Sequence, residues 1–383
     1  MSTLLSRRQL LAGAGAGVSF LSRGRAAEPV IEYRELGRTG LKVSSLGFGC
    51  MLASDPTVIE RAADLGINYF DTARLYQGGN NERMVGAALK GRRDKVVLAT
   101  KAAGGSKDKV LEQLDTSLRE LGTDYVDIWF LHMRNTPEEV TPELLEAQEI
   151  AKKAGKIRFR GVSFHFNMDR MLDHLTKLGV IDVALVSYNF TVWPEVTQAI
   201  ERARKAGLGI VAMKTMAGGL ARIQKGDRLY GQNPAELTEK LKRPGAMLAA
   251  LKWVLRNRFV DTAIVGITDL EQLEEDMRAM REPFTDADAK LLAAILPELR
   301  ERYCSGCGHC GGVCPYGVRV ADVQRCLVYA EGYRNYPLAR TTYLELGPQE
   351  QARRCLDCAQ CRVSCRRGLD LRPRLVYAHQ LLA

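Results

Sequence analysis

The sequence predicts an α/β fold in which a (β/α)8 TIM-type barrel is followed by a small cysteine-rich domain. Eight short, strand-like apolar runs alternate with segments of helical periodicity, which is the count of a (β/α)8 barrel. Several of these runs are almost continuously apolar, as expected for parallel strands that are covered on both faces. No glycine-rich loop follows the first run, where an open doubly wound sheet would need one to bind a dinucleotide.

The barrel is expected to follow a β-hairpin and to continue through regularly alternating elements. Residues 31–49 contain two strand-like runs separated by the turn GRTG, which predicts the hairpin. Residues 108–121 are typical of the helical segments, because their apolar residues recur every three or four positions. The eight predicted barrel strands are residues 43–49, 67–73, 95–101, 126–132, 157–164, 183–189, 209–215 and 262–268.

Residues 1–27 have the features of an export signal that is removed from the mature chain. Arg7 and Arg8 precede an apolar run, and small residues gather at Ala26 and Ala27. The run, at about twelve residues, is shorter than the roughly twenty that span a bilayer, so no transmembrane span is expected in the mature chain. The paired arginines resemble a twin-arginine signal, which implies export to the periplasm of a protein already folded around its cofactors.

Composition divides the rest of the chain into three parts. The barrel is expected over residues 28–284, a connecting helix with a Thr or Asp cap over 285–303, and a cysteine domain over 304–383. The last boundary follows from the cysteines, because nine of the ten lie from Cys304 onward. Residues 217–244 form a long polar connection after the seventh strand, and we expect this segment to act as a lid over the barrel.

The formal net charge of +10 does not by itself indicate a nucleic-acid-binding protein. Basic residues are scattered, part of the excess lies in the removable N-terminus, and no aromatic and basic platform is present. We therefore expect no nucleic-acid partner.

Four chemically useful side chains follow the second, third and fourth predicted strands: Asp71, Tyr76, Lys101 and His132. Because the carboxyl ends of parallel barrel strands open on one face, these groups should converge. A tyrosine, with a pKa of about 10, needs a nearby cation to exchange a proton near neutral pH, and Lys101 is the candidate cation. The set suits protonation of a carbonyl oxygen while hydride reaches its carbon. Asp71 would fix Lys101, and His132 would orient the substrate.

On these residues the chain resembles the aldo-keto reductase superfamily. The segments EYRELGRTGLKVS, DTARLY with Glu82, ATK and LH occur in the family's order, and the resemblance covers residues 31–282. It implies a TIM-type barrel and a NAD(P)(H) cofactor bound extended across its top face. It also implies the reversible reduction of a small-molecule aldehyde or ketone to an alcohol.

The positions that the resemblance assigns to the nicotinamide cofactor match less closely. Ser163 is kept, but Phe164 stands where asparagine is usual and Leu185 where glutamine is common. No Arg or Lys stands in the loop after the eighth strand, so a preference for NADPH is not indicated. Either other groups such as Asn189 and Lys214 hold the carboxamide, or the site has changed its cofactor. The residues expected near the cofactor are Ser163, Asn189, Lys214, Gly266, Thr268 and Glu275.

The cysteine domain carries the most specific motif. The run CSGCGHCGGVCP has the Cys-x2-Cys-x2-Cys-x3-Cys spacing of bacterial two-cluster ferredoxins, and CLDCAQCRVSC repeats it. In such runs three cysteines hold one [4Fe-4S] cluster and the fourth binds the other cluster. Zinc and disulfides are the alternatives, but neither requires a repeated triplet. The two predicted ligand sets are Cys304, Cys307, Cys310 and Cys365, and Cys355, Cys358, Cys361 and Cys314.

The two halves pose a problem of electron number. Nicotinamide transfers two electrons as hydride, whereas a cluster transfers one at a time, and no flavin motif connects them. The preferred hypothesis is an exported oxidoreductase that interconverts a carbonyl and an alcohol and retains NAD(P)(H) tightly. Its clusters would exchange electrons with a redox partner protein or a membrane electron donor. Two alternatives stay open: an electron-transfer protein whose barrel is a binding scaffold without nicotinamide chemistry, and an ordinary reductase with structural clusters.

Overall fold

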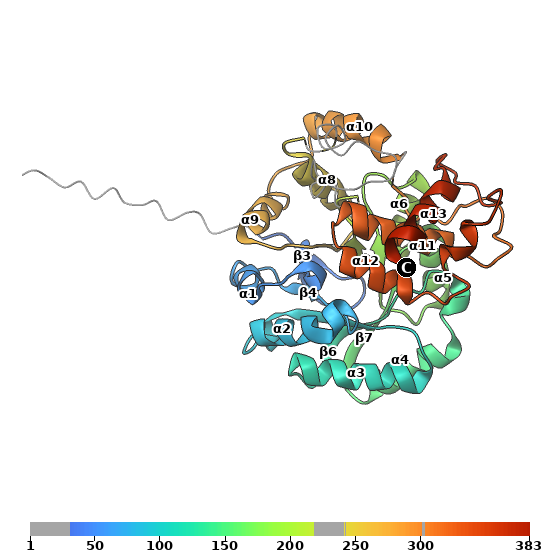
Figure 1. The fold of residues 1–383 in the computed structure, drawn as a ribbon. Coiled ribbons are helices and arrows are strands. Elements are labelled where there is room, and N and C mark those ends of the chain that lie inside the picture. Colours follow the sequence, from blue (N-terminus) through green and yellow to red (C-terminus); the bar gives the residue numbers. More distant parts are fainter. Residues whose placement is uncertain (1–30, 218–240, 242, 301–302) are drawn as a thin grey trace, which may run out of the picture. The chain divides into compact units, whose positions relative to one another are not determined.

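Eight parallel strands close into a barrel, as the alternation of strand-like and helical segments predicted (Figure 1). Neighbouring strands follow the chain order from β3 to β10, and β10 pairs with β3 to close the ring. The computed structural model describes residues 31–217, 241, 243–300 and 303–383. The barrel strands are β3 (Leu46–Gly49), β4 (Tyr69–Asp71), β5 (Val97–Ala102), β6 (Val126–Leu131), β7 (Ile157–Phe164), β8 (Val183–Ser187), β9 (Gly209–Met213) and β10 (Thr262–Val265).

The predicted hairpin is also confirmed: β1 (Tyr33–Glu35) and β2 (Lys42–Ser44) pair antiparallel before the barrel begins. Large buried side chains such as Tyr69, Phe130 and Leu185 fill the barrel interior. A separate apolar layer lies between the strands and the surrounding helices. These helices are α1 (Pro56–Asp64), α2 (Asn80–Ala88), α3 (Lys107–Leu121), α4 (Pro142–Lys153), α5 (Met168–Leu178), α6 (Pro194–Lys205), α8 (Ala246–Leu255) and α9 (Leu270–Arg278).

Helix α3 shows how the sequence specifies these helices. Its residues Val110, Leu114 and Leu118 recur on one face and are buried against the barrel. The side chain of Ser106 accepts a hydrogen bond from the backbone N–H of Lys109 and so caps the first turn.

The predicted connecting helix is α10 (Asp286–Arg300). Its start is fixed by reciprocal hydrogen bonds, because Thr285 N–H donates to Asp288 Oδ2 at 2.7 Å and Asp288 N–H donates to Thr285 Oγ1 at 3.3 Å. Its buried face packs with α8, where Leu292 and Ile295 share an apolar cluster with Ala249.

The cysteine-rich tail, residues 303–383, folds around a hydrophobic core of its own that includes Val323, Leu327, Tyr343 and Leu375. Cys326, which lies outside the cysteine motif, is buried in this core. By contacts, residues 31–383 form one compact unit, so the predicted boundary near residue 303 separates two cores within that unit. The tail helices are α11 (Val320–Leu327), the π-helical turn η6 (Val328–Gly332), α12 (Tyr336–Leu344), η7 (Ala352–Cys355) and α13 (Leu371–Leu382).

The tail lies directly against the barrel, beside the connection between β7 and α5. Gly306 has a φ of +70°, and a Cβ there would lie 2.2 Å from the carbonyl oxygen of His165. Gly308 has a φ of +75°, and its Cβ would lie 1.7 Å from Oδ1 of Asn167. Only glycine permits both the left-handed backbone and this close approach.

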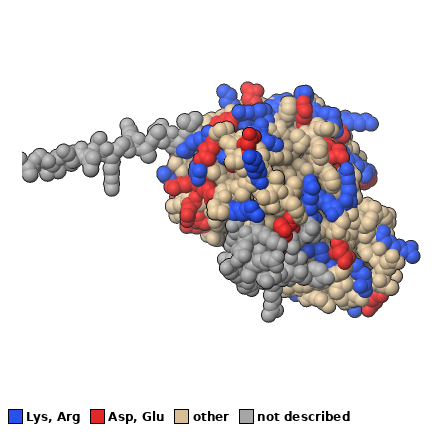
Figure 2. Space-filling view, turned by 90° about the horizontal axis from the view of Figure 1, so that it is seen from above, with Lys and Arg blue, Asp and Glu red and all other residues tan. Residues whose placement is uncertain are grey.

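Two predictions fall on residues that the structure leaves undescribed. The export signal, residues 1–27, lies outside the described residues, and so does most of the predicted lid, residues 218–240 and 242. Among the described residues, no helix has the length and apolar character needed to cross a membrane. On the face drawn in Figure 2, basic and acidic side chains are interspersed.

The close approach of the tail to the barrel predicts a specific pattern of stability. Gly306→Ala should lower the thermal unfolding temperature more than Gly317→Ala, which has a similar φ of +77° but nothing within 4 Å of its Cβ. The control carries only the strain of a left-handed residue, about 1–2 kcal/mol. Gly306→Ala adds overpacking, which costs about 1–3 kcal/mol more. Equal losses, measured by thermal unfolding of anaerobically purified protein, would contradict the described contact.

Candidate functional site

A cavity of about 900 Å³ lies at the carboxyl ends of the barrel strands, and we call it the Tyr76 pocket. Asp71 at the end of β4, Tyr76 after it, and His132 after β6 all line this pocket. The structure therefore brings these three predicted residues together. The tail contributes a wall that the sequence did not reveal: Tyr329, Tyr333, Leu338, Thr341, Thr342 and Glu345.

Lys101, the fourth predicted residue, lies in β5 and is 1% exposed. Its Nζ donates hydrogen bonds to Oδ1 of Asp71 and, at 2.7 Å, to the backbone oxygen of Thr72. It also donates to Oη of Tyr76 at 3.3 Å. A buried ammonium requires such partners, because an unpaired buried charge is strongly destabilising.

Polar contacts with α2 hold the loop that carries Tyr76. Arg74 forms an ion pair with Glu82, which is fully buried. The other carboxylate oxygen of Glu82 accepts a hydrogen bond from Thr100 Oγ1 at 2.6 Å. Because Thr100 precedes Lys101 in β5, Glu82 ties the tyrosine loop to the strand that supplies the lysine.

Burial sets the protonation states of the two groups that face the pocket. It raises the pKa of the Tyr76 phenol well above its usual value, and the carboxylate of Asp71 raises it further. Burial lowers the pKa of the His132 imidazole well below its usual value, and the cations of Lys101 and Arg325 lower it further. Near neutral pH, Tyr76 is therefore a phenol and His132 a neutral imidazole.

This result differs from the expectation that Lys101 favours the phenolate of Tyr76. The lysine lies at the expected place, but its charge is paired with Asp71. The neighbouring carboxylate opposes the effect of the ammonium, and desolvation opposes any charge on the phenol. Spacing along the sequence identifies the neighbours of a group but not the net charge around it.

Two further basic side chains line the pocket. His165 follows β7, and burial lowers its pKa well below the usual value, with the cation of Lys214 lowering it further. No motif singled out His165, although its place after a strand is the signal that identified His132. Burial and, to a smaller extent, the cation of Arg325 lower the pKa of Lys214 to about 7. The Lys214 Nζ lies 5.4 Å from the ring centroid of Tyr329, so barrel and tail meet here.

Most of the residues expected around the nicotinamide do not line this pocket; Lys214 and Gly266 do. Ser163 is 1% exposed, and its Oγ accepts a hydrogen bond from Met133 N–H at 3.0 Å. Asn189 uses its side chain within the chain, because Nδ2 donates to the backbone oxygen of Lys214 at 2.9 Å and Oδ1 accepts from Thr191 Oγ1 at 2.7 Å.

The two residues expected at the adenosine end lie on or near α9. Thr268 precedes this helix, and its Oγ1 donates to Oδ2 of Asp269 at 3.3 Å. Glu275 lies within α9 and is partly exposed. Neither lines the Tyr76 pocket.

The cysteines of the two runs gather around two further cavities, of about 430 and 380 Å³. We call them the first and the second cysteine cavity. Each contains three cysteines of one run and the fourth of the other, the same sets of four that the motif predicts. The first is lined by Cys304, Cys307, Cys310 and Cys365, and the second by Cys355, Cys358, Cys361 and Cys314.

An antiparallel bridge between the two cysteine runs explains why the fourth cysteine of each run lines the cavity of the other run. Gly311 and Ser364 exchange two backbone hydrogen bonds, of 3.0 and 2.8 Å. Each residue lies between the third and the fourth cysteine of its run, so each run crosses from one cavity to the other at the bridge. Val320 lines both cavities, which are therefore neighbours.

No disulfide joins any of the ten cysteines, all of which lie among the described residues. Burial is the main cause that raises the pKa of Cys304 to about 12, and its neighbours Cys310, Cys307 and Cys365 contribute to this rise. Within the described ranges, no group of three or more His, Cys, Asp or Glu side chains is arranged to hold a single metal ion.

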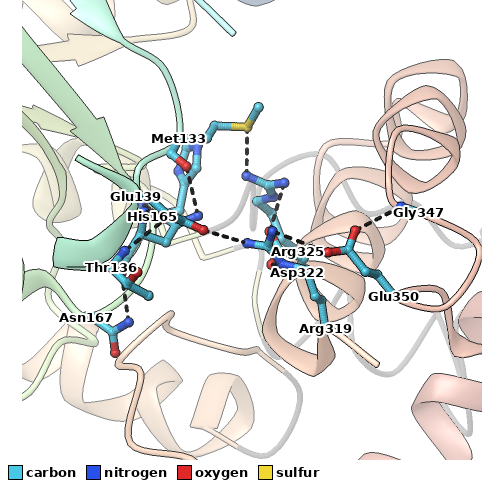
Figure 3. Close-up of polar contacts among 11 residues, drawn as sticks. Met133, Thr136, Glu139, His165, Asn167, Arg319, Asp322, Arg325, Gly347 and Glu350 are labelled. Carbon is cyan, nitrogen blue, oxygen red and sulfur yellow. Dashed lines mark hydrogen bonds and ion pairs between the residues drawn. The ribbon is translucent and has the colours of Figure 1, made fainter. Parts of the chain in front are cut away.

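Polar contacts also join the tail to the loop after His132 (Figure 3). Arg325 of α11 donates to Sδ of Met133 at 3.1 Å, and Met133 has a left-handed φ of +57°. Arg319 forms an ion pair with Glu139 at 3.5 Å. Asp322 is paired with both arginines, at 2.8 Å to Arg319 and 3.1 Å to Arg325. The tail thus contacts the residue that follows His132.

Comparisons with known proteins agree with this geometry. Residues 53–297 match the model of the aldo/keto reductase family. L-galactose dehydrogenase of Arabidopsis thaliana is 30% identical over 289 residues, which cover 66% of this chain and 89% of that protein. L-glyceraldehyde 3-phosphate reductase of Escherichia coli K12 is 28% identical and covers 65% of this chain and 88% of that protein. The solved holo form of aldo-keto reductase AKR11C1 from Bacillus halodurans is 29% identical, with a TM-score of 0.59, and covers 73% of this chain and 98% of that one.

The charge balance around Tyr76 predicts the effect of one substitution. Asp71→Asn should lower the pKa of Tyr76, because it removes a carboxylate that raises this pKa and leaves the Lys101 ammonium unneutralised 3.3 Å from Oη. The pKa can be followed through the Cζ signal of 13C-tyrosine-labelled protein, assigned with Tyr76→Phe. Glu82→Gln, a change farther from the phenol, is the control. An unchanged or raised pKa in Asp71→Asn would contradict the described pairing.

Proposed function

Because the chain belongs to the aldo/keto reductase family and is therefore an oxidoreductase, we propose that it interconverts a carbonyl and an alcohol in the Tyr76 pocket. The observation that carries this proposal is the buried chain of contacts from Asp71 through Lys101 to Tyr76, with His132 beside it. The ring centroids of Tyr76 and His132 are 6.1 Å apart, so one carbonyl oxygen placed between the rings can meet both side chains.

In the direction of reduction, the phenol of Tyr76 and the neutral imidazole of His132 donate hydrogen bonds to the carbonyl oxygen. These donors stabilise the negative charge that develops on the oxygen as its carbon is reduced. Tyr76 then transfers its proton to the oxygen, and the Lys101 ammonium stabilises the phenolate that remains. The carbon gains a hydride, which carries two electrons and one proton, and Tyr76 supplies the second proton; oxidation of the alcohol reverses these steps.

NAD(P)(H) is the usual electron carrier of the family, but the carboxamide contacts of the family do not fit the described residues. Phe164 and Leu185 offer no polar side-chain atom, and Ser163 is 1% exposed and binds Met133. The proton chemistry of Tyr76 and His132 depends only on this chain's own side chains, so no step above is routed through a nicotinamide.

Two [4Fe-4S] clusters in the cysteine cavities complete the proposal. A cubane binds its four thiolates through four different irons, so its ligands surround a space and do not meet at a single metal ion. The repeated spacing and the gathering of four thiols around each cavity support such clusters. When bound, they supply one-electron transfer, and the cysteines of this chain would hold them.

We further propose that the protein is exported to the periplasm by the twin-arginine route and exchanges electrons there with a redox partner. Arg7 and Arg8 before an apolar run support this location. A second candidate function is electron transfer by the tail alone, with the barrel as a binding scaffold. The apolar residues Phe164 and Leu185 at the carboxamide positions favour it, and the Asp71, Lys101 and Tyr76 contacts oppose it.

The assignment of Tyr76 predicts a large loss of activity without a loss of structure. Tyr76→Phe should lower kcat for the reduction of small aldehydes, with reduced methyl viologen as electron donor, by about 10²–10⁴-fold. Tyr33→Phe, on the exposed β-hairpin, should leave kcat unchanged. Iron content and thermal stability are measured alongside to show that both variants remain folded. Full activity of Tyr76→Phe would refute the role of Tyr76, whereas no aldehyde reduction by the wild-type protein would favour the scaffold function.

The cluster assignment predicts how iron is lost. The wild-type chain should contain about eight irons, and Cys307→Ser should lose about four of them. Cys365→Ser added to Cys307→Ser should lose no more, because both thiols belong to the first cavity, whereas Cys307→Ser with Cys358→Ser should lose all. Cys326→Ser, in the core of the same domain, is the control. Iron and sulfide are measured after anaerobic purification, together with nicotinamide released on denaturation. Stoichiometric nicotinamide would support hydride transfer, and its absence with no binding of added NAD(P)(H) would exclude that step.

A further inference from the structure

The first cysteine cavity faces the Tyr76 pocket. Its loop contacts the backbone of His165 through Gly306, and the His165 side chain lines the pocket. His165 thus lies between the pocket and the loop of the first cavity.

Like the first, the second cysteine cavity is lined by tail residues alone, and it shares no lining residue with the Tyr76 pocket. It adjoins the first cavity through Val320. Among its lining residues, Tyr316, Arg354 and Arg362 are exposed. The second cavity therefore lies next to the molecular surface.

Large apolar side chains are exposed around the second cavity. Val313, beside Cys314, is 82% exposed, and Tyr316, two residues after Cys314, is 52% exposed. They are the two most exposed large hydrophobic residues that the structure describes. Leu356, beside Cys355, is 40% exposed. Exposed apolar side chains gathered at one site are typical of a surface that binds another protein.

The same surface is strongly basic. Residues 351–372 contain six arginines, two aspartates and no other charged residue. Arg353, Arg354 and Arg362 are exposed and form no ion pair with the described residues. The two aspartates of the segment, Asp357 and Asp370, are also exposed, so arginines outnumber them three to one. We call Val313, Tyr316 and Leu356, together with these three arginines, the tail surface.

We propose that the tail surface is the docking site of an acidic one-electron carrier protein, which exchanges electrons at the second cavity. This inference rests on the proposed function, since it takes the two cavities as cluster sites. Charge complementarity selects an acidic partner, and the exposed apolar side chains provide the contact area. Each encounter transfers one electron. Two encounters supply the two electrons that a carbonyl gains on becoming an alcohol, and two carriers are oxidised; alcohol oxidation reduces two carriers instead.

A pair of carriers that differ in charge tests this proposal. The probes are a basic cytochrome c and the same cytochrome with its lysines succinylated, which is acidic. Dithionite-reduced holoprotein, freed of excess dithionite, is mixed with each oxidised cytochrome, and haem reduction is followed by stopped flow. The acidic form should react faster, and its rate should fall as salt is raised, because salt screens exposed charges.

Variants then locate the docking site. Arg353→Glu should lower the rate with the acidic cytochrome by about tenfold at low ionic strength, because rim charges act mainly on association. Arg353 is exposed and lines neither cysteine cavity. Arg61→Glu, at an exposed position in α1 on the barrel, changes the charge by the same amount and should change the rate little. Figure 1 shows α1 to the left of the tail helices.

The outcomes separate this inference from the proposed function. A faster reaction with the basic cytochrome, equal losses in Arg353→Glu and Arg61→Glu, or no reaction with either cytochrome would overturn the docking site. Methyl viologen is a small donor that needs no docking surface, so aldehyde reduction with it should be the same in wild type and in Arg353→Glu. Normal iron content without any viologen-driven reduction would instead overturn the proposed function and leave the docking result standing.

Discussion

The buried charge of Lys101 is the constraint around which the Tyr76 pocket is organised. An ammonium that is 1% exposed is stable only with close partners, and removal of one partner of a buried pair costs about 3–5 kcal/mol. Asp71, at the end of the neighbouring strand β4, supplies the opposite charge. The parallel register of β4 and β5 places Asp71 beside Ala99, two residues before Lys101. The same ammonium reaches Tyr76. Closure of the barrel thus brings Asp71, Lys101 and Tyr76 together, because all three lie at or after the ends of the adjacent parallel strands β4 and β5.

The tail contributes lining residues to the Tyr76 pocket but none of the four predicted catalytic groups. Its helices α11 and α12 and the turn η6 lie between the two cysteine runs in the chain, and residues of η6 and α12 form one wall of the pocket. The cysteine loop lies against His165 at Gly306, where no side chain intervenes. The tail therefore forms one wall of the Tyr76 pocket and also contains the first cysteine cavity. A cluster bound by both runs would also fix the segment that forms the wall.

Much of this could be predicted from the sequence, because the signals are local. Apolar runs of the correct length gave the eight strands, and residues at strand ends gave Asp71, Tyr76, Lys101 and His132. The contribution of the tail to the pocket could not be predicted, since Tyr329 and Tyr333 carry no local mark of packing on a distant barrel. The protonation of Tyr76 was also beyond the sequence, because it depends on burial and on the charge of Asp71. Ser163 matches a family position, yet its hydroxyl accepts a hydrogen bond from Met133, a side-chain orientation that no motif specifies.

The barrel is proposed to carry out a two-electron reaction and the tail one-electron transfer, and the tail has two neighbouring cysteine cavities. Carbonyl reduction needs two electrons at one carbon, and a protein partner is too large to enter the Tyr76 pocket. Electrons from the proposed partner would therefore have to cross the protein. The two cysteine cavities adjoin each other at Val320, the first beside the pocket and the second beside the exposed tail surface. Two clusters in these cavities would together hold the two electrons that the carbonyl requires. The fourth cysteine of each run lines the cavity of the other run, which holds the two cavities close together. If clusters occupy both cavities, the same crossing would also fix the route between them.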